Sequence, residues 1–337
     1  MKQGILPLHM KDLLEQATTV YNAHFDGTVR FERSIFTNWT CAIADCRYCY
    51  LSTKPKHRPG TETTALRTKE SIWAEALLCK KMGWHVSYIT GGLRVERIEQ
   101  LIPILEGLEK VLGYKVMMNY GPFAKSEVQK LAPYVTGMGS AIESFDETLH
   151  NEICPSKPLH TLTRYLEVVH SEGLKTLITI ILGLGETKDD LDMICENIEK
   201  YNIDIVQLCF LKPQEGTPYA DVPSPDTEYM AWWAAQLRIK FPTLYIKVAL
   251  VPECVDDFHL LLDAGVNAFS RFMIYKHFGT DLAQTLVKEC SGRLQGEFLS
   301  VPELTVEDLP FDEETNEKVE KKFWQYVKRL VPKHRGD

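Results

Sequence analysis

Residues 175–201 read KTLITIILGLGETKDDLDMICENIEKY and contain one complete strand-and-helix unit. The apolar run 175–185 predicts a β-strand that ends in glycines. Thr187 follows as a suitable helix N-cap, and acidic side chains lie in the first turn after it, where they favour the helix dipole. We therefore predict a helix over 187–201, directly behind the strand.

The same alternation of an apolar run and an amphipathic stretch recurs along the chain. Strands are predicted at 30–37, 85–90, 115–121, 136–144, 175–185, 204–213, 245–251 and 267–274. Helices are predicted at 68–84, 97–112, 124–134, around 160–172, 187–201, near 226–239, 255–264 and 280–291. Alternating units indicate a parallel sheet with helices outside. The fold class is therefore α/β, and eight units suit a closed (β/α)8 TIM-type barrel; a doubly wound open sheet is the structural alternative.

The barrel pattern is flanked by two further segments. We expect an N-terminal helical segment over 1–29, the barrel over 30–295, and a charged helical extension over 296–337. Within the extension, EETNEKVEKKFWQYVKRL at 313–330 predicts one amphipathic helix that packs on the outside of the barrel.

Composition excludes some classes of partner. The chain has 337 residues, 45% of them hydrophobic, and a formal net charge of −8. A negative charge argues against nucleic-acid binding, since nucleic-acid domains usually carry a basic surplus. No apolar run reaches the ~18 residues of a membrane span, and the first residues, MKQGILPLHMKDLLEQ, lack a signal-peptide pattern. We expect a cytoplasmic protein without a nucleic-acid or membrane partner.

The cysteines fall into two groups. Nine are present, and an odd number argues against a disulfide framework in a chain of this kind. Six are isolated among apolar residues and are interpreted as small buried hydrophobes: Cys79, Cys154, Cys195, Cys209, Cys254 and Cys290. The other three, Cys41, Cys46 and Cys49, are clustered in TNWTCAIADCRYCYLST at 37–53. This cluster lies in a long loop after the first predicted strand, where barrels of this class carry active-site residues.

Three clustered thiols favour some metal sites over others. A structural zinc site needs four ligands, usually two CxxC pairs; this loop has one pair, and His57 in KPKHRPG is the nearest further ligand. A 4Fe–4S cluster normally takes four thiolates, so three leave one iron open for a substrate or cofactor. A structural zinc or iron–sulfur protein, and a metal-free barrel with redox-sensitive thiols, stay as alternatives.

The clustered cysteines, with the aromatic Tyr48 before the last, resemble the signature of radical S-adenosylmethionine (SAM) enzymes. That signature is commonly CxxxCxxC, and here the first gap is one residue longer. Other motifs of the superfamily match in order. They are ITGG (89–92), IESFDETLHNEICP (142–155), IILGLGETKDDL (180–191), the segment 216–250 and DAGVNAFSR (263–271). The third of these closely resembles the GLGET segment of biotin synthase.

The resemblance implies a 4Fe–4S cluster bound by the catalytic cysteines Cys41, Cys46 and Cys49, with SAM on the open iron. Reductive cleavage of SAM would then give a 5′-deoxyadenosyl radical. The residues implied to contact SAM are Tyr48, Thr90, Gly91, Gly92, Glu143, Ile181, Gly183, Glu186 and Leu211. The expected electron donor is a low-potential protein such as ferredoxin or flavodoxin, and the exposed thiolate cluster predicts sensitivity to oxygen.

Polar residues at inward-facing or strand-end positions are candidates for contacting a small substrate. They are Asn119, Tyr120, Gln207, Lys247, Ser270 and Arg271, with Glu32 and Arg33 on the first strand as further candidates. Of these, Lys247 and Arg271 have the charge to hold a carboxylate.

The resemblance is closest to the branch of biotin synthase and the hydrogenase-maturation enzyme HydE. Biotin synthase needs three more cysteines and an arginine for a second cluster, and matching positions here have Met117, Leu177 and Lys247. We therefore expect no auxiliary cluster and no biotin synthase activity.

The longer first gap between the cysteines resembles the HmdB (HcgA) family, whose spacing is CX5CX2C. This implies formation of the pyridinol ring from a small precursor, in biosynthesis of the guanylylpyridinol cofactor of Hmd-type hydrogenase. HydE-like or methylornithine-synthase-like chemistry on another small substrate is the alternative within the superfamily.

Overall fold

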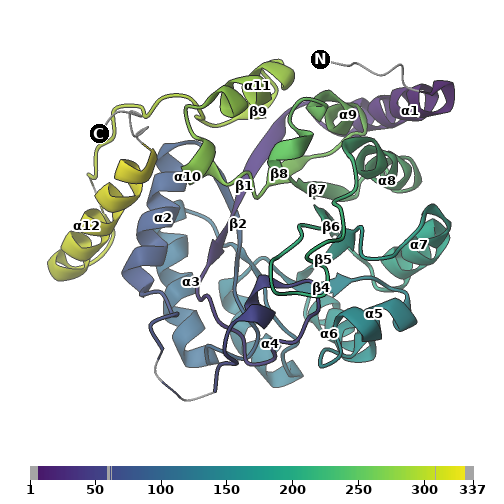
Figure 1. The fold of residues 1–337 in the computed structure, drawn as a ribbon. Coiled ribbons are helices and arrows are strands. Elements are labelled where there is room, and N and C mark those ends of the chain that lie inside the picture. The colour runs from purple at the N-terminus through teal and green to yellow at the C-terminus, as the bar shows by residue number, and fades with distance from the viewer. Residues whose placement is uncertain (1–6, 59–60, 62, 308, 331–337) are drawn as a thin grey trace.

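The computed structural model describes residues 7–58, 61, 63–307 and 309–330. Within these residues, parallel strands close into a barrel surrounded by helices (Figure 1). The barrel strands are β1 (Val29–Phe36), β2 (His85–Thr90), β3 (Met117–Asn119), β4 (Gly137–Glu143), β5 (Lys175–Leu182), β6 (Ile205–Phe210), β7 (Tyr245–Ala249) and β8 (Ala268–Ser270). Because β1 pairs with both β2 and β8, the sheet is closed, which confirms the (β/α)8 prediction and rules out an open doubly wound sheet.

Helices follow the strands on the outside of the barrel (Figure 1). They are α1 (Leu8–His24), α2 (Lys69–Lys81), α3 (Ile98–Leu112), α4 (Lys125–Leu131), α5 (Glu147–Ile153), α6 (Leu159–Ser171), α7 (Leu191–Lys200), α8 (Thr227–Lys240), α9 (Phe258–Asp263), α10 (Ile274–His277), α11 (Asp281–Glu289) and α12 (Glu313–Leu330). Side-chain caps fix several starts: Thr68 accepts from the Ser71 N–H, and Asp226 accepts from the Tyr229 N–H.

Two local predictions are wrong. The strand expected at 267–274 ends at Ser270, because Arg271 and Met273 adopt left-handed backbone angles, with φ of 63° and 32°, that a strand cannot accommodate. The helix α5 lies in a segment where none was predicted, and Asp146 caps it by accepting from the Leu149 N–H.

Alternation along the strands separates an outer core from the barrel interior. On β5, Ile178 and Ile180 join the large cluster between sheet and helices, whereas Leu177 points inward. Leu177, Met117, Tyr88 and Ile205 pack together inside the barrel. The barrel interior therefore contains an apolar layer as well as polar side chains such as Lys247 and Glu32.

Both flanking segments pack on the barrel. The helix α1 contacts α8 and α9, and α12 lies along α2 as predicted for an outer helix. Within α12, Phe323 is fully buried and the Tyr326 hydroxyl contacts Arg67 and Ser71. Residues 1–6 and 331–337 of the predicted flanking segments lie outside the described residues. Among the described helices, none combines the length and apolar character needed to cross a bilayer.

A short additional strand, β9 (Leu294–Gln295), extends the sheet beside β1. It precedes the loop that carries Phe298, whose buried ring packs edge-on against Phe31. The start of β1 is thereby covered by the chain that leads toward α12.

Candidate active site

The cysteine loop leaves the carboxyl end of β1 and lies against the β2–α3 connection. Cys41, Cys46 and Cys49 are all free and half-buried. The Cys41 sulfur accepts from two backbone N–H groups, those of Ala44 at 3.4 Å and Leu93 at 3.3 Å. These two N–H groups hold the Cys41 sulfur in place between the cysteine loop and the β2–α3 connection.

A fourth cysteine lies beside the cluster loop. Cys154 is fully buried, as predicted, and belongs to the apolar cluster against which Cys46 packs. The interaction between the two thiols lowers the pKa of Cys46 and raises the pKa of Cys154. Burial raises the pKa of Cys49 to about 11. Of the thiols of Cys46, Cys49 and Cys154, that of Cys46 is therefore the easiest to ionise.

The donor set fits an iron–sulfur cluster better than zinc. Over the described residues, no three or more His, Cys, Asp or Glu side chains converge closely enough to hold one metal ion. A 4Fe–4S cluster binds each thiolate through a different iron, so its ligands stand apart. His57 lies beside the cysteine loop, where its backbone N–H donates to the Cys41 carbonyl oxygen at 2.9 Å, but its side chain forms no such group with the cysteines among the described residues.

Gly91 and Gly92 form a turn after β2 that touches the cysteine loop directly. A Cβ atom at Gly92 would lie 1.8 Å from the Thr40 carbonyl oxygen, and one at Gly91 would lie 2.3 Å from the Asn38 amide nitrogen. Only glycine permits this approach of two backbones. The turn predicted to receive SAM therefore also sets the position of the residue before Cys41.

Asn38 joins the two loops and was not found from the sequence. Its side chain is fully buried, and its carbonyl oxygen accepts from the N–H groups of Gly92 at 2.9 Å and Thr40 at 3.3 Å. Its amide donates to Glu96 at 2.7 Å. The position of Asn38, three residues before Cys41, is the one trace of this role in the sequence.

Replacement of Asn38 by alanine is expected to loosen the glycine turn without unfolding the barrel. It leaves the buried Gly92 N–H unpaired, which costs about 1–3 kcal/mol. We expect SAM binding to weaken about tenfold, equivalent to 1.4 kcal/mol, in anaerobic equilibrium dialysis. Asn197→Ala, which removes a hydrogen bond within α7, is the control; equal SAM affinity in both variants would contradict the role of Asn38.

Glu143 ends β4 with one carboxylate oxygen paired and the other free. Its Oε1 accepts from the Tyr48 hydroxyl at 2.6 Å and from Lys157 at 3.1 Å. Its Oε2 is buried and has no partner among the described residues. Burial, followed by the Glu143 charge, raises the pKa of Tyr48 well above its ordinary value, so Tyr48 stays a donor. An orphaned acceptor beside the cysteine loop fits a ligand with hydroxyl groups.

Glu186 binds the backbone of its own turn. Its carboxylate accepts from three backbone N–H groups, those of Gly183, Leu184 and Gly185. Burial nevertheless raises its pKa above the ordinary value. Glu186 therefore shapes the turn after β5, and its contact with SAM stays a prediction.

The remaining predicted SAM contacts lie around the cysteine loop. Ile181, Leu211 and Tyr48 pack with Cys46 in one apolar cluster. The Thr90 hydroxyl donates to the backbone carbonyl oxygen of Asn119 at 2.9 Å, which joins the ends of β2 and β3.

The substrate candidates divide between the two faces of the barrel wall. Asn119 and Gln207 face the interior: Asn119 donates to Thr179, and Gln207 accepts from Tyr88. The prediction for Tyr120 is wrong, because it follows the inward-facing Asn119 and so points outward, packing in the outer core. Its hydroxyl contacts Thr37, and it lines a cavity of about 670 Å³ between the segments that follow β2 and β3.

Arg33 also points away from the interior. Its guanidinium pairs with Glu75 on α2 at 2.8 Å.

Lys247 lies inside the barrel, but it is already paired. Its side chain is fully buried, with Nζ 2.6 Å from Glu32 Oε2 and 2.5 Å from the Ser87 hydroxyl. Burial acts to raise the pKa of Glu32, and Lys247 outweighs it, so the pKa is lowered. The prediction that Lys247 grips a substrate carboxylate is therefore wrong, since Glu32 occupies that place.

Comparison with known proteins gives the family. The model described as the radical SAM superfamily matches residues 40–198. An uncharacterised protein of Methanocaldococcus jannaschii is 31% identical over 93% of this chain and 90% of its own length. The chain belongs to the radical SAM superfamily. Its cofactors are therefore a 4Fe–4S cluster and SAM, and it is an enzyme of the kind that takes electrons from a reductant.

Other proteins that are similar to this chain in sequence or in fold differ from one another in function. Biotin synthase 2 of Paracoccus denitrificans is 28% identical over 71% of this chain and 76% of its own. Methylornithine synthase superposes with a TM-score of 0.68 at 19% identity, covering 79% of each chain. The hydrogenase maturase HydG of Carboxydothermus hydrogenoformans gives 0.67 at 15% identity, covering 97% of this chain and 85% of its own. At such identities these two structures show the shared fold alone.

Proposed function

We propose that this radical SAM enzyme reductively cleaves SAM and directs the resulting radical to a small precursor inside the barrel. When bound and reduced, the cluster and SAM together supply a 5′-deoxyadenosyl radical. The observation that carries the proposal is the juxtaposition of the three-cysteine loop with Glu143, whose Oε2 is buried and unpartnered.

The protein's own residues bind, orient and shield. Cys41, Cys46 and Cys49 would hold the cluster. Tyr48 and Lys157 both bind Glu143 Oε1, which leaves Oε2 to accept from ribose hydroxyls.

Burial acts to lower the pKa of Lys157, but nearby negative charges act to raise it and have the larger effect, so the pKa is raised. Glu143 is the largest source of this negative charge. Lys157 therefore stays positive beside Glu143. Ile181 and Leu211 line the same region with apolar surface, which limits water near a reactive radical.

The narrower assignment is to the pathway of the guanylylpyridinol cofactor of Hmd-type hydrogenase. It is supported by the widened first cysteine gap, a feature that this chain shares in kind with the HmdB family. The barrel interior also supports a reaction without sulfur insertion: Met117 and Leu177 pack in its apolar layer, and Lys247 is paired with Glu32. Ferredoxin or flavodoxin is the proposed electron donor.

The pathway assignment has its own test. The gene is introduced into a methanogen that lacks its own HmdB but keeps the rest of the pathway, and Hmd-type hydrogenase activity is measured. Restored activity is expected, with a Cys46→Ala version as the inactive control. If activity is not restored although the protein is produced and carries its cluster, the pathway assignment fails and another small substrate is required.

The proposed ligand set predicts different metal contents for neighbouring cysteines. Alanine at Cys41, Cys46 or Cys49 should reduce iron after anaerobic reconstitution from about four per chain to below one. Cys154→Ala should keep its iron, because Cys154 contacts Cys46 without belonging to the ligand loop. Iron and sulfide analysis with absorption spectra measures this; equal loss in Cys154→Ala would contradict a three-cysteine site.

A further inference from the structure

The cations on the inner side of the barrel are neutralised by the protein itself. Lys247 is paired with Glu32 at 2.6 Å, and Lys157 with Glu143 at 3.1 Å. All four side chains are at most 5% exposed. The deeper part of the site is therefore a set of closed ion pairs, and a substrate gains no charge interaction there.

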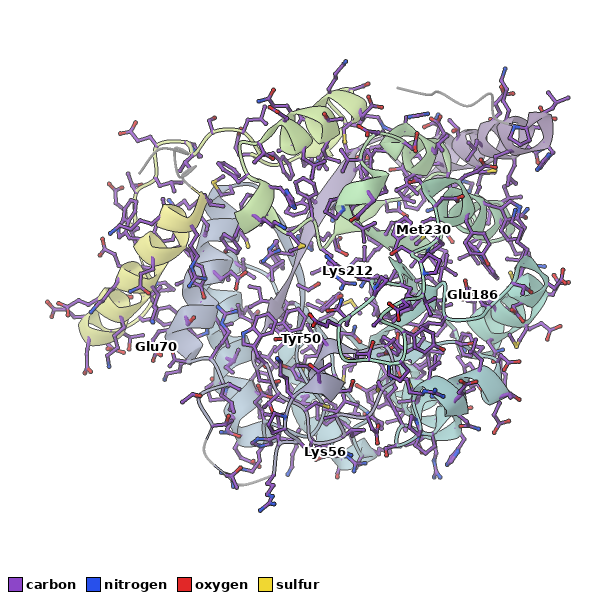
Figure 2. The ribbon with its side chains drawn as sticks, in the orientation of Figure 1. Tyr50, Lys56, Glu70, Glu186, Lys212 and Met230 are labelled. Carbon is purple, nitrogen blue, oxygen red and sulfur yellow. The ribbon has the colours of Figure 1, made fainter. Side chains whose placement is uncertain are left out.

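Two cations at the mouth of the barrel differ from these. Arg271 directly follows β8, and Lys212 lies just after β6; Figure 2 shows Lys212 close to the centre of the view into the barrel. Over the described part of the chain, neither has a carboxylate within 4.0 Å. Lys212 Nζ instead lies 3.6 Å from the sulfur of Met273, which ties it to the loop that carries Arg271.

The backbone presents Arg271 in an unusual way. Its φ of 63° is left-handed, a conformation that costs free energy for a residue with a side chain. The side chain is exposed, yet its charge acts inside the barrel: burial raises the pKa of Cys209 to about 11, and Arg271 is the nearby charge that most opposes this. Cys209 lies on β6, which is separated from β8 by one strand, β7.

Two buried polar side-chain atoms of the barrel wall have no partner among the described residues. Ser270 is 1% exposed, and its hydroxyl makes no hydrogen bond to any described residue. The side-chain oxygen of Asn119, Oδ1, is likewise buried and unpaired in the described structure. Both lie at the carboxyl ends of strands, on β8 and β3, where a bound molecule would meet them. Buried polar atoms are normally paired, so these two mark places for ligand groups.

We propose that Arg271 and Lys212 form an anion clamp at the barrel mouth, which holds a carboxylate or phosphate group of the substrate while Ser270 and Asn119 bind its other polar groups. The proposal rests on the proposed function, and it names the substrate class as a small organic anion. A guanidinium offers two parallel N–H donors to such a group, and the lysine adds a second charge. Because β8 pairs with β1, the clamp lies next to the strand from which the cysteine loop leaves.

The test uses the anaerobically reconstituted enzyme with SAM present. Binding of benzoate, phenyl phosphate and the uncharged benzamide is measured by ligand-observed NMR at low salt, where charge contacts are least screened. At least one anion is expected to bind fivefold or more tightly than benzamide. The benzoate and phenyl phosphate arms distinguish a carboxylate site from a phosphate site.

Variants locate the binding. Arg271→Gln and Lys212→Gln should each weaken anion binding about fivefold or more, and Arg271→Lys should retain part of it. Lys276→Gln removes an exposed cation from the neighbouring helix α10 and should leave the affinity unchanged. Circular dichroism and cluster absorbance check that each variant is folded and loaded.

The outcomes separate the clamp from the proposed function. If the wild type forms deoxyadenosine from SAM but binds neither anion better than benzamide, the clamp is wrong and the proposed function stands. The clamp is also wrong if Arg271→Gln binds the anion as the wild type does. If the loaded wild type forms no deoxyadenosine while it binds anions through Arg271, the proposed function is wrong and the anion site stands as a site of unknown reaction.

Discussion

The Gly92→Ala variant is expected to fold into the barrel but to bind almost no iron–sulfur cluster. The new Cβ would lie 1.8 Å from the Thr40 carbonyl oxygen and 2.7 Å from the Cys41 Cα, and both are backbone atoms that cannot rotate away. The cysteine loop must therefore move. Since a misplacement of about 1 Å can cost about 100-fold in rate, we expect at least that loss in deoxyadenosine formation. Iron should fall below about one per chain, against about four in the wild type.

Gly173→Ala is the control for this variant. Gly173 also has a positive φ, of +73°, but a Cβ there would meet nothing within 4 Å. The variant should be destabilised only by the roughly 1–2 kcal/mol that a left-handed conformation costs an alanine. Its iron content and its rate of deoxyadenosine formation should be those of the wild type. Normal iron and SAM cleavage in Gly92→Ala would show that the glycine turn and the cysteine loop are not in contact, and would contradict the structure of the site.

Lys247→Met is expected to destabilise the whole barrel. It leaves the Glu32 carboxylate buried in the interior without its cation, and breaking a buried pair in this way typically costs about 3–5 kcal/mol. Anaerobic urea unfolding of the reconstituted protein measures the change in free energy. The double variant Glu32→Met with Lys247→Met removes both charges and should recover most of the loss, because an apolar replacement leaves no buried charge.

The pH dependence of these variants has a definite sign. The pKa of Glu32 is lowered in the folded wild type, so its contribution is present above the ordinary carboxyl pKa and is lost as pH falls through the lowered value. Without Lys247, burial raises the pKa of Glu32 instead. The deficit of Lys247→Met should then be greatest near neutral pH and shrink in acid. A loss below about 1 kcal/mol at neutral pH would contradict a closed ion pair in the interior.

Local patterns were sufficient for the architecture but not for contacts across the barrel. Apolar runs and capped helices predicted the strand-and-helix units, since both depend on neighbouring residues. The end of β8 was missed because an apolar run continues to Ile274, whereas the backbone turns at Arg271. The Tyr120 prediction failed for a simpler reason: Asn119 faces the interior, and alternation turns the next side chain toward the outer core, where Tyr120 packs.

In the candidate active site, too, local features could be predicted from the sequence and contacts between distant residues could not. The cysteine loop follows the first predicted strand, so its place at the barrel mouth was predictable. Asn38 contacts a glycine turn 54 positions away, and no spacing in the sequence indicates that contact. Lys247 and Glu32 meet because β8 pairs with both β7 and β1, which brings these two strands close together although they lie far apart in the sequence. Pairing between distant charges, which decides whether a cation is free for a ligand, requires the structure.

The central claim is that three thiols hold a cluster at which SAM is cleaved. It is tested most directly by reconstituting the protein anaerobically with iron and sulfide, reducing it with dithionite, adding SAM and measuring 5′-deoxyadenosine by chromatography. The account predicts deoxyadenosine from the wild type and none from Cys46→Ala. A wild type that binds a 4Fe–4S cluster and SAM but forms no deoxyadenosine, or a Cys46→Ala variant that forms as much as the wild type, would contradict it.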